Sequence, residues 1–227
     1  MAFVKIGNLL SDYISNIDNQ WIKKLNSKIK EASYKNPWFT KESIDFSLKY
    51  WSKQLTKDKL EPWLSKYELY NAEKQTIAVI MAGNIPMVGF HDLLCVLITG
   101  NKLLIKFSNK DDVLIKFLLE YLLYTDSVFN DKIVVKESIL KDFDKVIATG
   151  TNNTSKYFNY YFKGIPSLIR KNRFSIAILS GEENQIDLEN LGNDIFTFFG
   201  LGCRNVSKLF VPKNYSFDLF FKSIYKW

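Results

Sequence analysis

The sequence predicts an α/β fold with a mostly parallel sheet, and three observations lead to this prediction. From about residue 75, short β-branched apolar runs alternate with segments of helical periodicity. Most of these runs end in a turn that contains glycine, asparagine, serine or threonine. The 227 residues are 47% hydrophobic and 24% charged, which is an ordinary globular composition. Such alternation is typical of parallel strands joined by helical crossovers, with ligands at the carboxyl ends of the strands.

Residues 1–70 are expected to form a helical region of their own. Aromatic residues and lysines recur there at helical spacing, and we assign the aromatic residues to core packing. Thr40 is the predicted start of one helix, whose apolar side begins at Ile44. A further helical turn is predicted at residues 61–69, with Pro62 at the first helical position, where the missing N–H group is tolerated.

The elements after residue 75 follow one another in a regular order. Strands are predicted at residues 76–82, 102–107, 132–135, 145–149, 175–180 and 207–212. Helices are predicted at residues 87–100, 111–124, 155–162 and 188–199. Gly100 is expected to close the first of these helices, and Asp111 or Asp112 to begin the second.

Charge and cysteine content narrow the class of protein. The net charge is +7, but the lysines are dispersed, so we expect solvated surface lysines rather than a nucleic-acid interface. No apolar run is long enough for a membrane span, and the first twenty residues lack the apolar stretch of a secretory signal. Two cysteines in unlike segments predict a reduced, cytoplasmic protein. Two cysteines and one histidine do not form a zinc ligand set, so no metal site is expected.

Two of the turns that follow strands carry polar side chains. Asn84 comes directly after a predicted strand, in "AGNIP", where its amide could donate to a developing oxyanion or simply cap the next helix. Lys106 ends the next strand and Ser108 follows it. A lysine at this place could hold ribose hydroxyls or a phosphate, and the alternative is an ordinary surface lysine with an extended side chain.

Two later turns add hydroxyl groups and a thiol. Thr149, Gly150 and Thr151 stand between a strand and a helix, where free backbone N–H groups suit a pyrophosphate, although the G-x-G-x-x-G fingerprint is missing. Cys203 follows a glycine-containing turn and precedes Arg204, surroundings that favour a thiolate. A structural cysteine is the alternative, and we assign Cys95 to that class. The single histidine, His91, leaves little basis for a Cys–His protease.

The order of the four turns resembles that of the aldehyde dehydrogenase superfamily: Asn-x-Pro, Lys-x-Ser, Thr-Gly-Thr and Gly-x-Cys. The segments "MAGNIPMVGFHDLL", "DKVIATGTNN", "IRKNRFSIAIL" and "FFGLGCRNVSKL" are most similar to the LuxC-like acyl-CoA reductases. The resemblance covers residues 75–212 and implies a Rossmann-like fold of the aldehyde dehydrogenase type. It also implies roles for the matched residues: Cys203 as nucleophile, Asn84 as oxyanion donor, Lys106 and Ser108 at the adenosine ribose, and Thr149, Gly150 and Thr151 at the pyrophosphate.

Two departures from the superfamily pattern refine the expected chemistry. Dehydrogenases that hydrolyse their acyl-enzyme carry a glutamate where this chain has Ile169, beside Arg170, so no carboxylate is placed to activate water. NAD-selective members often carry a glutamate where this chain has Asn109, followed by Lys110. With no carboxylate to repel a 2′-phosphate, NADPH is the expected cofactor.

The resemblance therefore implies an NADPH-dependent reductase that converts a long-chain acyl-CoA to a fatty aldehyde through a cysteine thioester. Two alternatives stay open: a CoA-acylating aldehyde dehydrogenase working oxidatively, or a non-catalytic acyl or nucleotide carrier. An acyl-protein synthetase partner and a homo-oligomer are further options. Residues 1–70 would be the helical region, 71–180 the cofactor-binding domain and 181–227 the start of an incomplete catalytic domain. Because the chain stops soon after Cys203, we expect it to be a fragment.

Overall fold

The computed structural model describes residues 2–69 and 73–227, and it consists of two compact units. The first unit is Met1–Lys171 and the second is Asn172–Trp227. Each unit is described by itself below. The predicted boundary between residues 70 and 71 lies outside the described residues.

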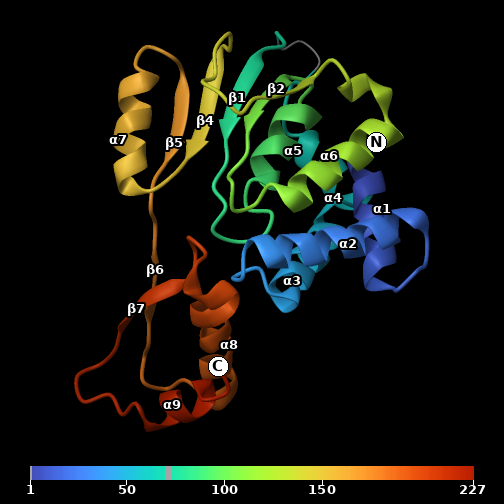
Figure 1. The fold of residues 1–227 in the computed structure, drawn as a ribbon. Coiled ribbons are helices and arrows are strands. Elements are labelled where there is room, and N and C mark those ends of the chain that lie inside the picture. The colour runs from blue at the N-terminus through green and yellow to red at the C-terminus, as the bar shows by residue number, and fades with distance from the viewer. Residues whose placement is uncertain (1, 70–72) are drawn as a thin grey trace. The chain divides into compact units, whose positions relative to one another are not determined.

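The first unit begins with four helices, which confirms a helical N-terminal region (Figure 1). They are α1 (Ala2–Ile14), α2 (Gln20–Lys35), α3 (Lys41–Gln54) and α4 (Lys57–Leu64). Thr40 is the N-cap of α3, as predicted, and its side chain accepts a hydrogen bond from the Ser43 N–H. The prediction for Pro62 is wrong, because α4 begins at Lys57 and Pro62 lies inside it. The helix ends two residues later, so the proline removes only one hydrogen bond from a last turn.

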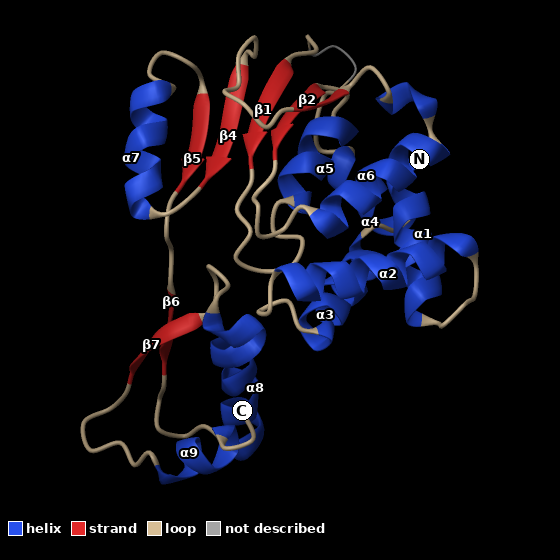
Figure 2. Cartoon of the chain, in the orientation of Figure 1, coloured by secondary structure: helices blue, strands red, loops and turns tan. Residues whose placement is uncertain are grey.

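A five-stranded sheet follows, and all of its pairings are parallel. Its strands are β1 (Thr76–Ile80), β2 (Lys102–Lys106), β3 (Ile133–Val135), β4 (Lys145–Thr149) and β5 (Ser167–Arg170). The strand order is β3-β2-β1-β4-β5, so the direction of winding reverses between β1 and β4. Figure 2 labels β2, β1, β4 and β5 of this sheet. A reversal of this kind is the topological switch point at which α/β proteins bind ligands.

Helices cover both faces of this sheet. They are α5 (Phe90–Ile98), α6 (Val113–Thr125) and α7 (Asn152–Tyr161), with a short 3-10 turn η1 (Ser127–Phe129) after α6. Ile77 and Val79 of β1 face the large core built with α5, α6 and the N-terminal helices. Ala78, between them, faces the opposite layer, where Phe158 and Phe162 of the α7 segment pack. This alternation along a strand is the period-2 burial of a sheet covered on both sides.

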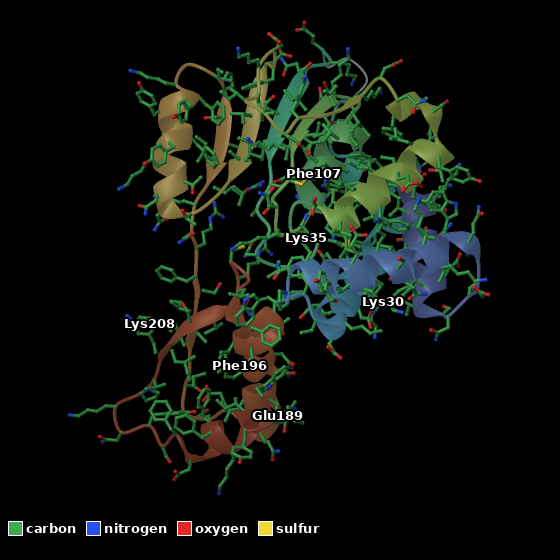
Figure 3. The ribbon with its side chains drawn as sticks, in the orientation of Figure 1. Lys30, Lys35, Phe107, Glu189, Phe196 and Lys208 are labelled. Atoms are coloured by element: carbon green, nitrogen blue, oxygen red, sulfur yellow. The ribbon has the colours of Figure 1, made fainter. Side chains whose placement is uncertain are left out.

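The second unit has its own small parallel sheet and its own core. Its elements are β6 (Ser175–Ile178), α8 (Gln185–Phe196), the 3-10 turn η2 (Thr197–Gly200), β7 (Val206–Phe210) and α9 (Asp218–Ile224). Leu179, Leu188, Leu191 and Phe220 form the buried centre. The Phe196 and Trp227 rings stack at 6.1 Å, and Lys226 pairs with Glu189 at 3.3 Å, which ties the end of the chain to α8 (Figure 3 labels Phe196 and Glu189).

Helix α8 begins three residues before its predicted start because of its cap. Asn184 accepts hydrogen bonds from the N–H groups of Ile186 and Asp187, and the Asp187 side chain accepts one from the Asn184 N–H. This reciprocal capping box stabilises the first turn. In the part of the chain that the structure describes, no helix combines the length and the apolar character needed to cross a bilayer.

Candidate functional site

Three of the four turns singled out in the sequence meet at one edge of the five-stranded sheet. Asn84 follows β1, Lys106 ends β2, and Thr149 ends β4. Because β1, β2 and β4 are parallel neighbours, their carboxyl ends lie at the same edge. The β1 and β4 ends flank the switch point, so Asn84 and the Thr149 turn lie at the position where α/β proteins commonly bind ligands.

The turn after β1 packs directly against the turn after β2. The Met81 N–H donates to the Lys106 carbonyl at 3.1 Å and extends the pairing of the strands. Gly83 then approaches Ser108 so closely that a β-carbon at position 83 would collide with the Ser108 hydroxyl. The same β-carbon would lie 3.2 Å from the β-carbon of Asp111. Glycine is therefore required at position 83 for the Asn84 turn to adopt this path.

The two polar side chains of the β2 turn, Lys106 and Ser108, are half-buried. The Lys106 ammonium lies 3.5 Å from the Ser138 carbonyl, which is a weak contact that a ligand could displace. The Ser108 hydroxyl accepts the Lys110 N–H at 3.3 Å and so shapes the turn itself. Their predicted contacts with an adenosine ribose stay a prediction.

The turn after β4 has the form of an anion site, although its donors differ from those expected. The Thr151 side chain caps α7 by accepting the Thr154 N–H at 3.1 Å. The Gly150 N–H is already donated to the Arg170 carbonyl at 3.0 Å, so it cannot also bind a phosphate. The first N–H groups of a helix have no partner within the helix, which leaves the amides of Asn152 and Asn153 to face an anion.

A partly buried ion pair, which the sequence analysis did not find, lies between β5 and α5. One nitrogen of the Arg170 guanidinium, Nη1, contacts the two carboxylate oxygens of Asp92 at 2.8 and 2.6 Å. Burial would raise the pKa of Asp92, but the nearby His91 and the hydrogen bonds from Arg170 together lower it. The two partners are 78 residues apart, so no local sequence signal connects them.

Asp92 also determines the charge of His91. The Asp92 carboxylate, with an oxygen 3.8 Å from Nδ1 of His91, and the neighbouring Cys95 raise the pKa of His91 to about 10. The Cys95 sulfur lies 3.7 Å from Nδ1 of the imidazole, one helical turn along α5. His91 therefore carries a positive charge at neutral pH and acts as the second cation beside Asp92.

Cys203 lies in the second unit, exposed and without a disulfide partner. The loop that carries it is fixed by Asn205, whose side chain accepts the Gly202 N–H at 2.7 Å. The same amide donates to the carbonyls of Asp194, Ile195 and Thr197 at 2.9, 3.3 and 3.0 Å. Asn205 was missed in the sequence because a single asparagine after a cysteine carries no specific signal. The pairing of Cys203 with Asn84 stays a prediction.

Left-handed backbone precedes Cys203. Phe198 and Phe199 have φ angles of 56° and 57°, followed by Gly200 at 72°. This region is unfavourable for bulky residues, and two such residues in sequence persist only where their surroundings hold them. The turn is therefore strained on the side from which the chain enters the Cys203 loop.

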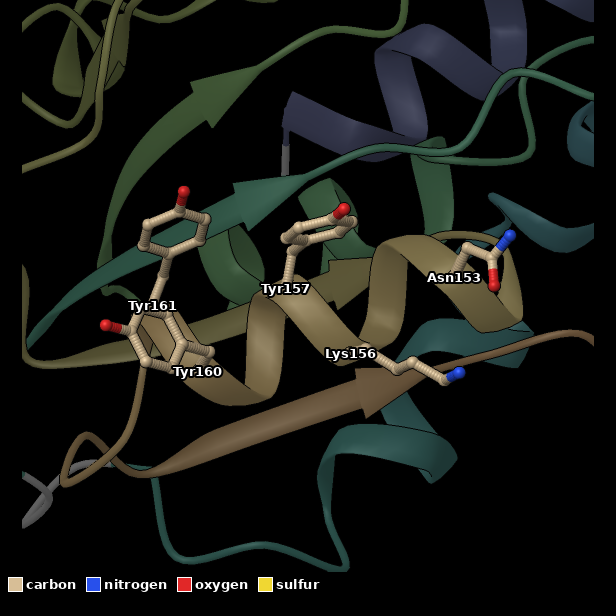
Figure 4. Close-up of a pocket in the computed structure, with 5 residues that line it drawn as sticks. All are labelled: Asn153, Lys156, Tyr157, Tyr160 and Tyr161. Atoms are coloured by element: carbon tan, nitrogen blue, oxygen red, sulfur yellow. The ribbon is translucent and has the colours of Figure 1, made fainter.

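A surface hollow of about 650 Å³ lies along the outer face of α7 (Figure 4). Asn153, Lys156, Tyr157, Tyr160 and Tyr161 line it. The three tyrosines are largely exposed, so the hollow offers phenol rings and one ammonium group to solvent. It begins at Asn153, in the first turn of α7.

Comparisons with known proteins agree with this geometry. The family model described as acyl-CoA reductase (LuxC) matches residues 14–219. An indole-3-acetaldehyde dehydrogenase solved with NAD+ is similar over 100% of this chain and 49% of its own, at 14% identity and a TM-score of 0.71. An aldehyde dehydrogenase from Bacillus cereus in an NAD+ complex matches 99% of this chain and 48% of its own, at 12% identity and 0.67.

A third solved structure, substrate-bound AldH from Staphylococcus aureus, covers 99% of this chain and 53% of its own, at 20% identity and a TM-score of 0.61. At these identities the likeness concerns the fold alone. The chain spans about half the length of these structures. A search of curated sequences found no match.

Proposed function

Because the chain belongs to the LuxC acyl-CoA reductase family, we propose that it takes part in the NADPH-dependent reduction of a long-chain acyl-CoA to a fatty aldehyde. The observation that supports this most is the family match over residues 14–219, which includes all four turns and Cys203. On this proposal, residues 71–180 form the cofactor-binding region. Residues 181–227 carry the nucleophile.

The first step would use the Cys203 thiolate. Its sulfur attacks the thioester carbonyl, a carbon–sulfur bond to Cys203 forms, and the bond to CoA breaks as CoA leaves as a thiolate. The Asn84 amide would donate to the oxyanion of the tetrahedral intermediate. A bound nicotinamide would supply the hydride that reduces the enzyme thioester, and the resulting thiohemiacetal releases aldehyde and restores the thiolate.

The residues at the sheet edge are compatible with a dinucleotide. The α7 amides of Asn152 and Asn153 suit a pyrophosphate, and Lys106 and Ser108 lie on the neighbouring strand end. Lys110, exposed in the β2 turn, supplies a cation near the position of a 2′-phosphate, which supports NADPH.

The absence of a hydrolytic base at the expected position supports a reductase. Position 169 is an isoleucine, and its neighbour Arg170 is paired with Asp92. That pairing keeps Asp92 ionised but engages both of its oxygens, which makes it a poor base for activating water. A CoA-acylating aldehyde dehydrogenase acting oxidatively is the second candidate, since it also needs no water. A non-catalytic acyl or nucleotide carrier is the third.

The test incubates the purified protein with palmitoyl-CoA and NADPH and follows nicotinamide absorbance together with aldehyde by mass spectrometry. We expect aldehyde to form and radioactive acyl-CoA to label the protein covalently. Cys203→Ala should abolish the label, whereas Cys95→Ala, the matched control, should retain it. Label that persists in Cys203→Ala would refute the assigned nucleophile, and equal label without aldehyde would favour the carrier.

Cofactor choice has its own test. Lys110→Glu should raise the KM for NADPH by about tenfold or more, with less effect on NADH, because a carboxylate would repel the 2′-phosphate. A wild-type protein that prefers NADH would overturn the assignment of NADPH. We also propose an acyl-protein synthetase partner, a homo-oligomer and a cytoplasmic location. A pull-down experiment tests the partner, sedimentation tests the oligomer, and cell fractionation tests the location.

A further inference from the structure

Asp111 is a buried carboxyl group that the proposed chemistry does not use. Its residue is 3% exposed, and it lies between the end of β2 and the start of α6. Among the described residues, no donor reaches either carboxylate oxygen with hydrogen-bond geometry. A buried polar group without a partner is costly, so its retention at this place calls for a physical reason.

Asp111 lies where the turn after β1, which contains Asn84, meets the turn after β2, which contains Ser108. The Asp111 N–H donates to the Ser108 carbonyl at 3.1 Å, which closes the turn after β2. On the other side, Gly83 packs against Ser108 and Asp111. The polar groups that act on the Asp111 carboxyl are the backbone N–H groups of Met87 and Val88, in the turn that contains Asn84.

That turn contains a strained residue and is held from a second direction. Met87 has a φ of 61°, although its side chain is bulky and only 1% exposed. The buried Ser47 hydroxyl, from α3, donates to the Pro86 carbonyl at 3.1 Å. The segment between Asn84 and α5 is thus held by α3 on one side and faces Asp111 on the other. Strain of this kind persists only where neighbouring groups over-determine the backbone.

We propose that Asp111 is a positioning residue whose buried side chain holds the Asn84 turn against the turn after β2. The Asn84 role rests on the proposed function, but the positioning of the turn does not. In its neutral form the carboxyl can sit in the apolar junction without the desolvation cost of a charge. Its side chain packs against Gly83 and its N–H closes the turn after β2, so Asp111 fixes the path of the Asn84 turn.

The surroundings of Asp111 support the neutral form. Burial raises the pKa of Asp111 well above its usual range, the amides of Met87 and Val88 lower it in part, and the charge of Asp112 raises it further. Asp112 is the only charged group that contributes among the described residues. Since the folded pKa exceeds the unfolded one, the free energy of unfolding falls as pH rises from about 3.8 to the folded pKa.

The experiment compares Asp111→Ala and Asp111→Asn with a matched control, Asp112→Asn, which removes the neighbouring carboxylate at the start of α6. Hydrogen exchange by mass spectrometry reports on residues 82–90 without any need for activity. We expect about tenfold faster exchange there in Asp111→Ala, because the turn opens more often. Asp111→Asn, a neutral side chain of the same shape, should retain slow exchange, as should Asp112→Asn.

Activity gives the second readout. Asp111→Ala should lower kcat for acyl-CoA reduction by about tenfold or more with little change in the KM for NADPH, because misplacing one oxyanion donor affects the transition state. Asp111→Asn should restore kcat and lessen the loss of stability at alkaline pH. Unchanged exchange in Asp111→Ala, or equally fast exchange in Asp111→Asn, would overturn the proposal. If the wild-type protein reduced no acyl-CoA, the proposed function would be wrong. The hydrogen-exchange rates of residues 82–90 would still test the positioning role of Asp111.

Discussion

His91 shows how one carboxylate determines the charge of its neighbours. The Asp92 carboxylate makes the largest contribution to its pKa of about 10, followed by Cys95, whereas burial acts in the opposite direction. Because the folded pKa lies above the ordinary value of 6.5, protonated His91 stabilises the fold fully below pH 6.5. That contribution is lost as pH rises towards about 10.

The titration of His91 can be followed directly, since the chain contains a single histidine. Proton NMR of its imidazole should give a midpoint well above 6.5. Asp92→Asn should move this midpoint back towards 6.5, because it removes the main cause of the shift. Asp187→Asn, at the start of α8, is the matched control and should leave it unchanged. A wild-type midpoint at or below 6.5 would show that His91 and Asp92 are not paired in solution.

Single residues were predictable where a local rule applies. Thr40 caps α3, and Gly100 adopts a φ of 82° just beyond α5, both as predicted, because caps depend on the residues next to them. Pro62 was placed wrongly, because the same local rule fits several starts of a short helix. The partners of Asp92 and Asp111 could not be predicted, since they come from distant parts of the chain.

At the scale of elements, the loop that carries Cys203 combines strain with one organising side chain. Phe198 and Phe199 hold left-handed angles, while Asn205 joins Gly202 to the carbonyls at the end of α8. An asparagine can do this because its amide accepts and donates at once. The loop geometry therefore depends on the NH₂ group of one residue.

The Asn205→Asp variant distinguishes the hydrogen bond that the side chain accepts from those that it donates. The carboxylate can still accept the Gly202 N–H, but it cannot donate to the carbonyls of Asp194, Ile195 and Thr197. We expect a loss of about 1–3 kcal/mol in the free energy of unfolding, measured by chemical denaturation. Asn214→Asp, at an exposed position of the same unit, is the control and should cost far less. Equal stability of the two variants would show that Asn205 does not organise the loop.

The strands divide by how well they could be predicted. β1, β2 and β4 are buried on both faces and appear in the sequence as apolar runs. β5 was missed, because it is a four-residue edge strand with exposed Ser167 and half-exposed Leu168 and lacks an apolar run. Its existence depends on pairing with β4 rather than on its own residues.

For the whole molecule, the main feature is that two units have separate cores. Leu48 is fully buried in the core of the first unit, and Leu188 is 1% exposed in that of the second. Units with independent cores need not unfold together, so a single melting temperature does not describe such a chain.

Paired substitutions test this independence. Leu48→Ala should destabilise the first unit by about 2–5 kcal/mol, and Leu188→Ala should do the same to the second, because each leaves a cavity. In calorimetry each change should lower a different transition and leave the other in place. If both substitutions lowered one common transition to the same extent, the two units would be a single cooperative body.

The order of the four turns of the candidate site could be predicted from the sequence, but the hydrogen-bond donors within those turns could not. Four turns with polar or small residues after strands could be found from the sequence, because strand and turn signals are local. The donors at the β4 turn could not, since Gly150 gives its N–H to the edge strand that the sequence did not reveal. The amides that remain available to an anion thus depend on the pairing of Gly150 with Arg170, which lies in a different strand.

The pairing of Arg170 with Asp92 has a consequence for the edge of the five-stranded sheet. Arg170 is the last residue of β5, and residues 171–174, which follow it, form neither helix nor strand. The guanidinium joins this end of β5 to α5 through a buried carboxylate. Exchanging Asp92 for a neutral residue would therefore let the edge strand fray from its carboxyl end and expose backbone groups of β4 that β5 covers.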